Sequence, residues 1–366
     1  MFGWTSRQRN VAIASFLSWT LDAFDFFVLV FLLSDIATAF QVDIKQVTLA
    51  ILLTLAVRPI GALLFGRAAE KYGRKPVLMV NIALFSFFEL CTAAAPSLTV
   101  FLILRVIYGI AMGGVWGVAS SLAMETIPDR SRGMMSGIFQ AGYPFGYLLA
   151  AVVYGLLFDV VGWRGMFVIG AVPVFLLPFI WFKVQESPVW LAARERNEST
   201  ALMPVLKKNW KLCIYLVVLM AGFNFFSHGT QDLYPTFLKV QHGFDAHTVS
   251  LIAISYNIAS IIGGIFFGSL SEKIGRKKAI IIAALLSLPV IPLWAFSGGS
   301  WMLGLGALLM QFMVQGQRGG VPTYLTQLEP ANPRAGLPAV VAQLGHQIAS
   351  ANAPLQPYIA ASTRPT

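Results

Sequence analysis

The stretch Gly66-Arg-Ala-Ala-Glu-Lys-Tyr-Gly-Arg-Lys75 occurs a second time in this chain, as Gly268-Ser-Leu-Ser-Glu-Lys-Ile-Gly-Arg-Lys277. The two copies are 202 residues apart, and each follows the second apolar segment of its half. A weaker repeat pairs residues 125–133 with residues 329–336. Self-similarity over so long an interval indicates two related halves joined in one chain.

The composition identifies the solvent of this protein. Hydrophobic residues make up 57% of the 366 residues, charged residues only 11%, and the mean hydropathy is +0.72. An ordinary soluble domain has about 25% charged residues. A soluble fold of this size could not cover so much apolar surface with polar groups. We therefore expect most of the chain to lie in lipid.

Eleven apolar segments are long enough to cross a bilayer as helices, which takes about 20 residues each. They lie at about 12–34, 46–66, 76–95, 98–122, 134–157, 165–183, 211–238, 247–268, 278–297, 300–326 and 336–360. The expected fold is an all-α polytopic membrane protein. Its parts are an N-terminal six-helix bundle over 1–183, a cytoplasmic linker over 184–210 and a C-terminal bundle of five helices over 211–366.

The net charge of +10 reflects topology rather than a nucleic-acid partner. Most lysines and arginines lie in the N-terminus or in alternate short loops, at 7–9, 67–75, 130–132, 183–211, 273–278 and 334. This distribution is typical of an inner-membrane protein with a cytoplasmic N-terminus. The first apolar segment is too long for a cleaved signal peptide and contains two aspartates. Cys91 and Cys213 lie in apolar segments, so neither a disulfide framework nor a metal cluster is indicated.

The repeated loop, G-x-x-x-[DE]-[RK]-x-G-R-[RK], resembles the signature of the major facilitator superfamily. The resemblance covers essentially the whole chain. It implies twelve helices in two bundles, with alternating access to a site between them. Because the sequence supplies eleven segments, we expect helix 12 to be missing, and a truncated, non-transporting copy is one alternative. Six loop residues are expected to position neighbouring helix ends and to gate the cytoplasmic side: Gly66, Glu70, Arg74, Gly268, Glu272 and Arg276.

Several charged residues fall inside apolar segments. A charged side chain at the centre of a membrane helix costs about 2.5–3.5 kcal/mol on insertion scales, so each is a candidate functional residue. They are Asp22, Asp25, Arg58, Glu89, Arg105 and Arg318. We expect Arg58 to bind a substrate carboxylate, since guanidinium binds carboxylate in a bidentate way. The alternative is a structural ion pair with Asp22 or Asp25, which are also candidates for proton coupling.

The segment 211–238 contains a second set of candidates. Asn224, His228 and Asp232 are spaced four residues apart and therefore share one helix face. Histidine titrates near neutral pH, and an aspartate one turn away can stabilise the imidazolium. We expect His228 and Asp232 to load and unload a proton, and Asn224 and His228 to contact the substrate.

The same segment resembles a narrower group. The pattern N-x-x-[ST]-H-x-[ST]-Q-D-x-x-x-T is the signature of lactate/pyruvate–proton symporters of the yeast carboxylate-permease type, and residues 224–236 match it throughout. Relatives in the sialate-permease group are similar. The resemblance also implies that Gln343 and His346 face the pathway. A further stretch, residues 186–191, resembles the E-S-P-x-W-L element of metabolite–proton symporters.

Together these features predict proton-coupled symport of a small monocarboxylate by a monomer in the inner membrane, with no cofactor. The alternatives are sialic acid, an aromatic acid or a dicarboxylate as substrate. An enzyme is disfavoured because the chain lacks G-x-S-x-G, P-loop, H-E-x-x-H and G-x-G-x-x-G motifs.

Overall fold

The computed structural model describes residues 3–195, 209–231, 234, 237–238, 241–244, 246–328 and 344–345. Within these residues the regular elements are all helices. Eight helical stretches of the described part are long and apolar enough to cross a membrane: Ser6–Phe31, Lys45–Tyr72, Arg74–Ala93, Leu98–Thr126, Asp129–Gly170, Trp210–Gln231, Leu251–Ile274 and Arg276–Ala295. The last expected segment, 336–360, lies almost wholly outside the described residues.

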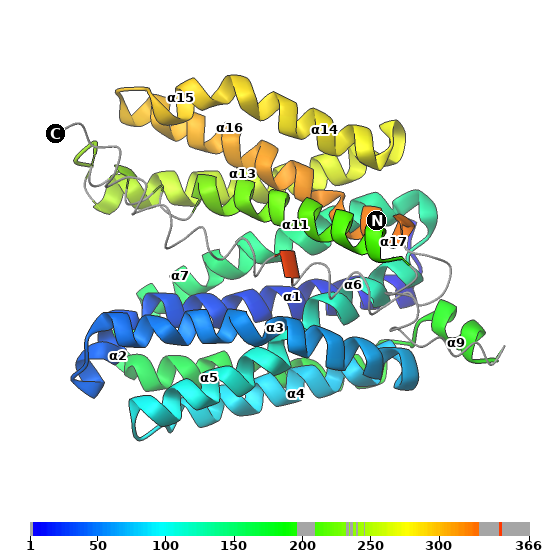
Figure 1. Ribbon diagram of the computed structural model, residues 1–366, viewed down its shortest axis with the longest axis horizontal. Coiled ribbons are helices and arrows are strands. Elements are labelled where there is room, and N and C mark those ends of the chain that lie inside the picture. Colours follow the sequence, from blue (N-terminus) through cyan, green and yellow to red (C-terminus); the bar gives the residue numbers. More distant parts are fainter. Residues whose placement is uncertain are drawn as a thin grey trace.

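The first half forms the lower layer in Figure 1. Its helices are α1 (Ser6–Phe31), α2 (Leu33–Phe40), α3 (Ile44–Tyr72), α4 (Arg74–Ala93), α5 (Leu98–Gly113), α6 (Val115–Thr126), α7 (Arg132–Gly170) and α8 (Leu176–Lys183). Two of the expected segments are joined in α7, which contains a kink at Gly162 where φ is +62°. The expected helix 165–183 is therefore divided among the end of α7, the short turn η2 (Val172–Phe175) and α8.

The second half forms the upper layer. It contains α11 (Trp210–Gln231), α13 (Ala246–Ile274), α14 (Arg276–Ser287), η3 (Leu288–Val290), α15 (Ile291–Ala295), α16 (Ser300–Gly319) and α17 (Val321–Leu328). The short helix α9 (Pro188–Glu195) follows the first half and projects beyond the two layers (Figure 1). Helices α3 and α13 run past the expected ends, to glycines with positive φ, Gly73 at +107° and Gly275 at +91°.

The sequence repeat reappears in how helices pack. A Cβ on Gly61 of α3 would lie 1.9 Å from the carbonyl oxygen of Ile110 in α5. The counterpart in the second half is Gly263 of α13, where a Cβ would lie 2.1 Å from the carbonyl oxygen of Phe312 in α16. Each residue of the second contact comes 202 residues after its counterpart in the first, which is also the distance between the two copies of the loop motif. Small residues at such positions let membrane helices approach closely.

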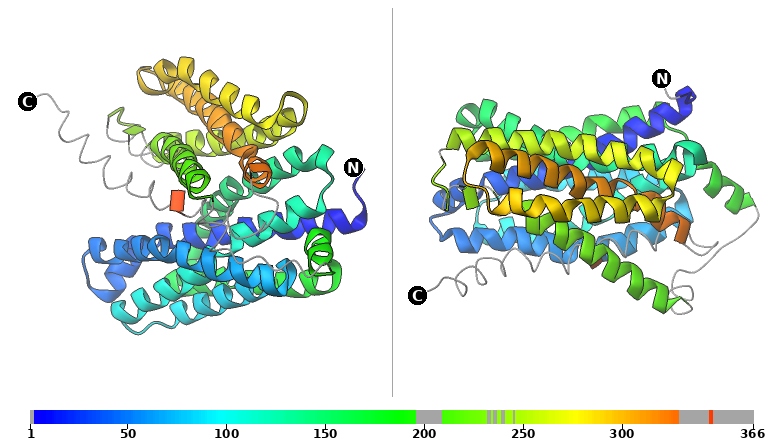
Figure 2. Two further views of the ribbon diagram at one scale, coloured as in Figure 1. Left: turned by 45° about the vertical axis from the view of Figure 1, so that its right-hand side comes forward. Right: turned by 90° about the horizontal axis from the view of Figure 1, so that it is seen from above.

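The two halves meet along α7, which packs against α13 and α16. The Ser136 hydroxyl donates to the carbonyl oxygen of Gly319 at 2.5 Å. A Cβ on Gly137 would lie 2.4 Å from the carbonyl oxygen of Gly264, so the two backbones are in direct contact. These contacts lie toward the end of the molecule that carries the loops 67–75, 129–132, 183–186 and 273–278, which we call the basic end. Figure 2 shows the two layers from two further directions.

We predict that Gly137→Val weakens this closed contact, because a larger side chain cannot fit against the backbone of α13. Cysteines placed at Ser136 and Thr323 report the contact by disulfide formation. The Ser136 Oγ and the backbone nitrogen of Thr323 are 3.4 Å apart. The background for this assay lacks Cys91 and Cys213. Cross-linking should be fast in the parent and at least about tenfold slower with Gly137→Val. Gly155→Val is the matched control, since a Cβ there meets nothing within 4 Å. Equal rates in all three proteins would contradict this account of the interface.

Candidate functional site

Two buried ion pairs lie within the apolar segments of the first half. Arg58 of α3 donates from its terminal nitrogen to the Asp22 carboxylate of α1 at 3.1 Å, and the Arg58 side chain is only 10% exposed. Arg105 of α5 donates to the Glu89 carboxylate of α4 at 2.8 Å, and both side chains are completely buried. The guanidinium of Arg105 also lies 3.9 Å from the centre of the Tyr108 ring. The pairs thus connect α1 with α3 and α4 with α5.

Asp25 adds a third carboxylate to this region. It is fully buried, and within the described part of the chain neither of its carboxylate oxygens has a hydrogen-bond partner. A Cβ on Gly170 would lie 3.2 Å from both Asp25 Oδ1 and Glu89 Oε1, so these two carboxylates face the same point of α7. With Asp22, Arg58, Glu89 and Arg105, Asp25 forms what we call the charge cluster. If all five groups were ionised, the cluster would carry one net negative charge.

Helix α11 carries the residues expected to contact substrate. Asn224 is completely buried, and neither polar atom of its side chain has a hydrogen-bond partner among the described residues. Ser227 Oγ accepts from Arg318 of α16 at 2.9 Å. The Thr230 hydroxyl accepts from Gln311 of α16 at 3.1 Å. His228, between these two contacts, is half-buried. The polar residues of α11 are therefore directed at least partly toward α16.

Helix α16 contributes a polar face that connects the halves. Gln311, Gln315 and Arg318 are spaced by four and three residues, which puts them on one side of the helix. The amide of Gln315 donates to the backbone carbonyl of Gln140 in α7 at 3.1 Å. The Arg318 guanidinium lies 5.8 Å from the centre of the Tyr143 ring, also in α7. This face thus contacts α11 of its own half and α7 of the other half.

The structure assigns neighbours to some predicted site residues and leaves others outside its scope. Arg58 is placed in an ion pair with Asp22, the alternative that the sequence left open. Asp232, Gln343 and His346 lie outside the described residues, so the pairing of His228 with Asp232 stays a prediction. The contacts of Gln311 and Gln315 were not anticipated. Their polar character inside an apolar segment, at helical spacing, is a signal that could have revealed them.

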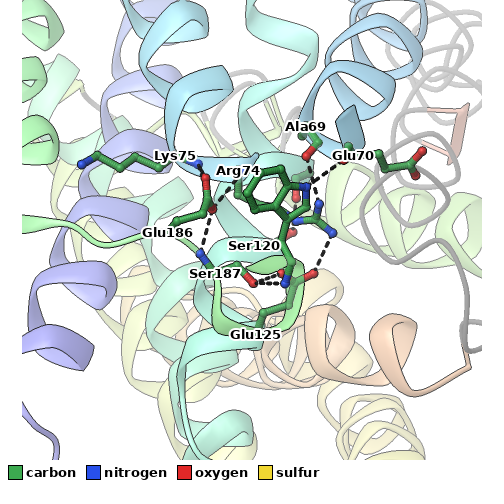
Figure 3. A network of polar contacts seen from close by, with 10 residues as sticks. Ala69, Glu70, Arg74, Lys75, Ser120, Glu125, Glu186 and Ser187 are labelled. Carbon is green, nitrogen blue, oxygen red and sulfur yellow. Dashed lines mark hydrogen bonds and ion pairs between the residues drawn. The ribbon is translucent and has the colours of Figure 1, made fainter. Parts of the chain in front are cut away.

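The first copy of the loop motif is held within its own half and by the linker (Figure 3). Arg74 forms an ion pair with Glu125 of α6 at 3.1 Å and donates to the carbonyl oxygen of Ala69 at 2.9 Å. Glu186 of the predicted linker accepts from the backbone N–H groups of Arg74 and Lys75, at 3.0 and 3.1 Å. This carboxylate therefore lies at the N-terminus of α4, where the helix dipole favours a negative charge.

Two further contacts complete this network. Ser187 donates to Glu125, and Trp190 of α9 donates from its indole nitrogen to the carbonyl oxygen of Glu70 at 2.7 Å. The linker stretch 186–190 is thus fastened to the loop by side chains and backbone together.

The second copy of the motif connects the halves. Arg276 repeats the internal bond of the first copy, donating to the carbonyl oxygen of Ser271 at 3.2 Å. Glu272, however, accepts from the backbone N–H of Met134 in α7 at 2.8 Å. A Cβ on Gly268 would lie 2.6 Å from the carbonyl oxygen of Gly133, so the glycine permits this approach. Gly66, its counterpart in the first copy, is buried.

Three comparisons relate this geometry to known proteins. Residues 15–354 match the family model described as Major Facilitator Superfamily. A carboxylic acid transporter protein homolog from Saccharomyces cerevisiae is 30% identical over 97% of this chain, and the chain spans 62% of that protein's length. The sialic acid transporter NanX of Escherichia coli is 29% identical, over 92% of this chain and 84% of the relative.

The fold is also similar to a solved structure. The proton:xylose symporter XylE bound to 6-bromo-6-deoxy-D-glucose superposes with a TM-score of 0.78. The match covers 96% of this chain and 89% of that chain at 19% sequence identity.

We predict that Arg105→Gln destabilises the protein strongly, because it leaves Glu89 buried without its counter-charge. Removing one partner of a buried ion pair typically costs about 3–5 kcal/mol of unfolding free energy. The measurement is the apparent melting temperature of purified protein in detergent. The double variant Arg105→Gln with Glu89→Gln is the matched control and should recover most of the loss. A double variant as unstable as the single one would contradict the ion-pair explanation.

Proposed function

Because the chain belongs to the major facilitator superfamily, we propose that it is a secondary active transporter that carries a small carboxylic acid together with protons across a membrane. Its family consists of transporters rather than enzymes, and its symporters need no cofactor. The protein itself is polytopic and lies in a membrane. The proposal concerns which acid is transported, how its transport is coupled to protons and which residues bind the acid and the protons.

The charge cluster is the observation that supports proton coupling. Three carboxylates and two guanidiniums are buried together, and an unbalanced charge removed from water costs several kcal/mol. Protonation of one carboxylate makes the cluster neutral. Asp25 is the assigned proton carrier, since both oxygens of its buried carboxylate lack partners in the described region, whereas Asp22 is paired with Arg58. His228 and Asp232 form the proposed second proton site, on the other half.

The relatives and the α11 motif support an acid as substrate. One relative is described as a carboxylic acid transporter homolog and another as a sialic acid transporter, and both descriptions name acids. The motif at residues 224–236 favours a monocarboxylate of the lactate and pyruvate type. Sialic acid is the second candidate, supported by NanX. The proposed substrate-contacting residues are Arg58, Asn224, His228, Gln343 and His346.

The loop motifs and charges support an orientation and a gate. We assign the basic end to the cytoplasm, together with the N-terminus, because lysine and arginine concentrate there. The conformation described above is then closed toward the cytoplasm. Glu70, Arg74, Glu272 and Arg276, with Gly66 and Gly268, form the proposed gate. Opening toward the cytoplasm requires the Glu272–Met134 bond and the glycine contacts to separate. We further propose that one copy of the chain suffices for transport.

We predict that reconstituted protein accumulates labelled lactate inside vesicles when the outer medium is more acidic than the interior. Membrane potential alone should not drive this accumulation. One-to-one symport carries one proton and one monocarboxylate anion in the same direction and moves no net charge, so the potential does no work on it. Proteoliposomes with an imposed pH step, or with a potassium-diffusion potential at fixed pH, separate the two drives. Uptake driven by potential at constant pH contradicts this stoichiometry. Excess pyruvate or sialic acid in the same assay shows which acid competes.

We predict that Asp25→Asn retains exchange but loses accumulation. The amide mimics the protonated carboxyl and cannot release a proton, so substrate-for-substrate counterflow continues while pH-driven uptake falls to background. Asp159→Asn, at an exposed position of α7, is the matched control and should behave as the parent. His228→Ala is expected to abolish accumulation as well. Normal pH-driven accumulation in Asp25→Asn would remove the charge cluster from the coupling mechanism.

A further inference from the structure

Two glutamine side chains lie buried on one face of α16, where the halves meet. Gln311 contacts α11 of its own half, and Gln315 contacts α7 of the other half. Both residues are at most 5% exposed. Because they are four residues apart on a helix, their side chains begin about 5–6 Å from each other. One small molecule can therefore contact both.

The amide of Gln315 has an orientation that its partner fixes. Its nitrogen lies 3.1 Å from the backbone carbonyl oxygen of Gln140 in α7. A carbonyl oxygen can only accept a hydrogen bond, so the NH2 group of the amide, and not its oxygen, must face Gln140. The oxygen of Gln315 is therefore directed elsewhere. It accepts no hydrogen bond within the part of the chain that the structure describes.

Thr230 of α11 orients the amide of Gln311 in the same way. The Thr230 hydroxyl directs its single hydrogen to backbone carbonyl oxygens of its own helix, at 2.8 Å for Phe226. Its oxygen can then only accept from the Gln311 nitrogen, 3.1 Å away. The oxygen of Gln311 is thus also directed away from its partner, and no described residue donates to it. Helix α16 therefore holds two oriented acceptors on one buried face.

These two acceptors match one end of an acid and not the other. Buried polar atoms are normally hydrogen-bonded to protein, water or a ligand. A carboxylate is itself an acceptor, so two further acceptor oxygens would repel it. The glutamine oxygens therefore suit the end of the acid that lies away from its carboxylate. A hydroxyl group at that end can donate to them, whereas a keto group can only accept.

We infer that Gln311 and Gln315 make this protein selective for hydroxy acids, by accepting hydrogen bonds from a hydroxyl group of the substrate. This inference rests on the proposed function and narrows its substrate class. Lactate and sialic acid carry hydroxyl groups, and pyruvate does not. A site built to bond a substrate hydroxyl rejects analogues that lack it, because its buried polar groups are then left unpaired.

The orientation of Gln315 also depends on how the halves are arranged. Gln315 belongs to the second half, and its partner Gln140 belongs to α7 of the first half. A Cβ on Gly264 of α13 would lie 3.5 Å from the Cγ of Gln315, so the stem of this side chain is packed as well. The acceptor is thus oriented in the conformation that is closed at the basic end. Separation of α7 from α16 breaks the bond to Gln140 and lets the amide rotate.

The test compares labelled acids in counterflow, which needs no proton gradient. 2-Fluoropropionate has the charge and nearly the size of lactate, but its fluorine cannot donate a hydrogen bond. In the parent, the apparent KM for 2-fluoropropionate should be at least about tenfold higher than the KM for lactate, and pyruvate should show a similar penalty. Exchange of 2-fluoropropionate or pyruvate with a KM equal to or below that of lactate overturns the inference and leaves the proposed function standing.

Two variants assign this preference to the glutamines. Gln311→Met and Gln315→Met keep the length of the side chain and remove the amide oxygen. Each should lower the ratio of the two KM values, for 2-fluoropropionate over lactate, at least about threefold. The double variant should bring the ratio close to one. Gln46→Met, at an exposed position near the start of α3, is the matched control and should keep the parent's ratio.

The ratio separates recognition of the hydroxyl from a structural effect, because a general loss of active protein changes both KM values or neither. A parent-like ratio in the double variant overturns the inference. If a methionine variant fails to fold, as judged by gel filtration, Gln311→Asn and Gln315→Asn take its place. Their shorter side chains withdraw the oxygen, so a parent-like ratio in both overturns the inference equally. A folded parent that exchanges neither lactate, pyruvate nor sialic acid overturns the proposed function and this inference together.

Discussion

Inside a bilayer there is no water to solvate a charge, so a buried ionised side chain must be matched by another charge or neutralised by a proton. The first half of this protein is organised around that constraint. Asp22 and Arg58 connect α1 to α3, and Glu89 and Arg105 connect α4 to α5. Asp25 then exceeds what the two guanidiniums can balance. One proton on a carboxylate removes this imbalance. The proposed proton coupling rests on that property of the cluster.

The repeated loop shows how two copies of one sequence take different roles. Both arginines bond to a carbonyl oxygen five residues earlier, so the local turn is the same in Arg74 and Arg276. The surroundings differ, because the first copy faces the linker with Glu186, whereas the second faces α7 of the other half. The first copy therefore joins elements within one half. The second forms a contact between the halves.

Arg318 and the charge cluster lie on opposite halves of the protein. Arg318 belongs to α16, while Asp22 and Asp25 belong to α1, and the stacked rings of Tyr143 and Trp19 lie between them. A transporter that couples two ligands needs each to alter the same movement. Gly319, which follows Arg318, accepts the bond from Ser136 of α7, whereas the Asp25 and Glu89 carboxylates face Gly170, at the other end of α7 beyond its kink at Gly162. The shared element is α7, which contacts both layers.

The sequence alone determined that this chain is helical, membrane-embedded and built from two related halves, because length, hydropathy and a repeat are properties of the chain itself. It also identified the buried charges, since a charged residue within an apolar segment is visible without a structure. It did not choose among Asp22, Asp25 and a substrate as the partner of Arg58, or place Ser227 against Arg318, 91 residues away. Those pairings depend on how each helix is rotated about its axis and where it crosses its neighbours. In lipid the outward face of a helix is as apolar as its packed face, so hydrophobic periodicity gives little information about rotation, and only the packed tertiary structure decides it.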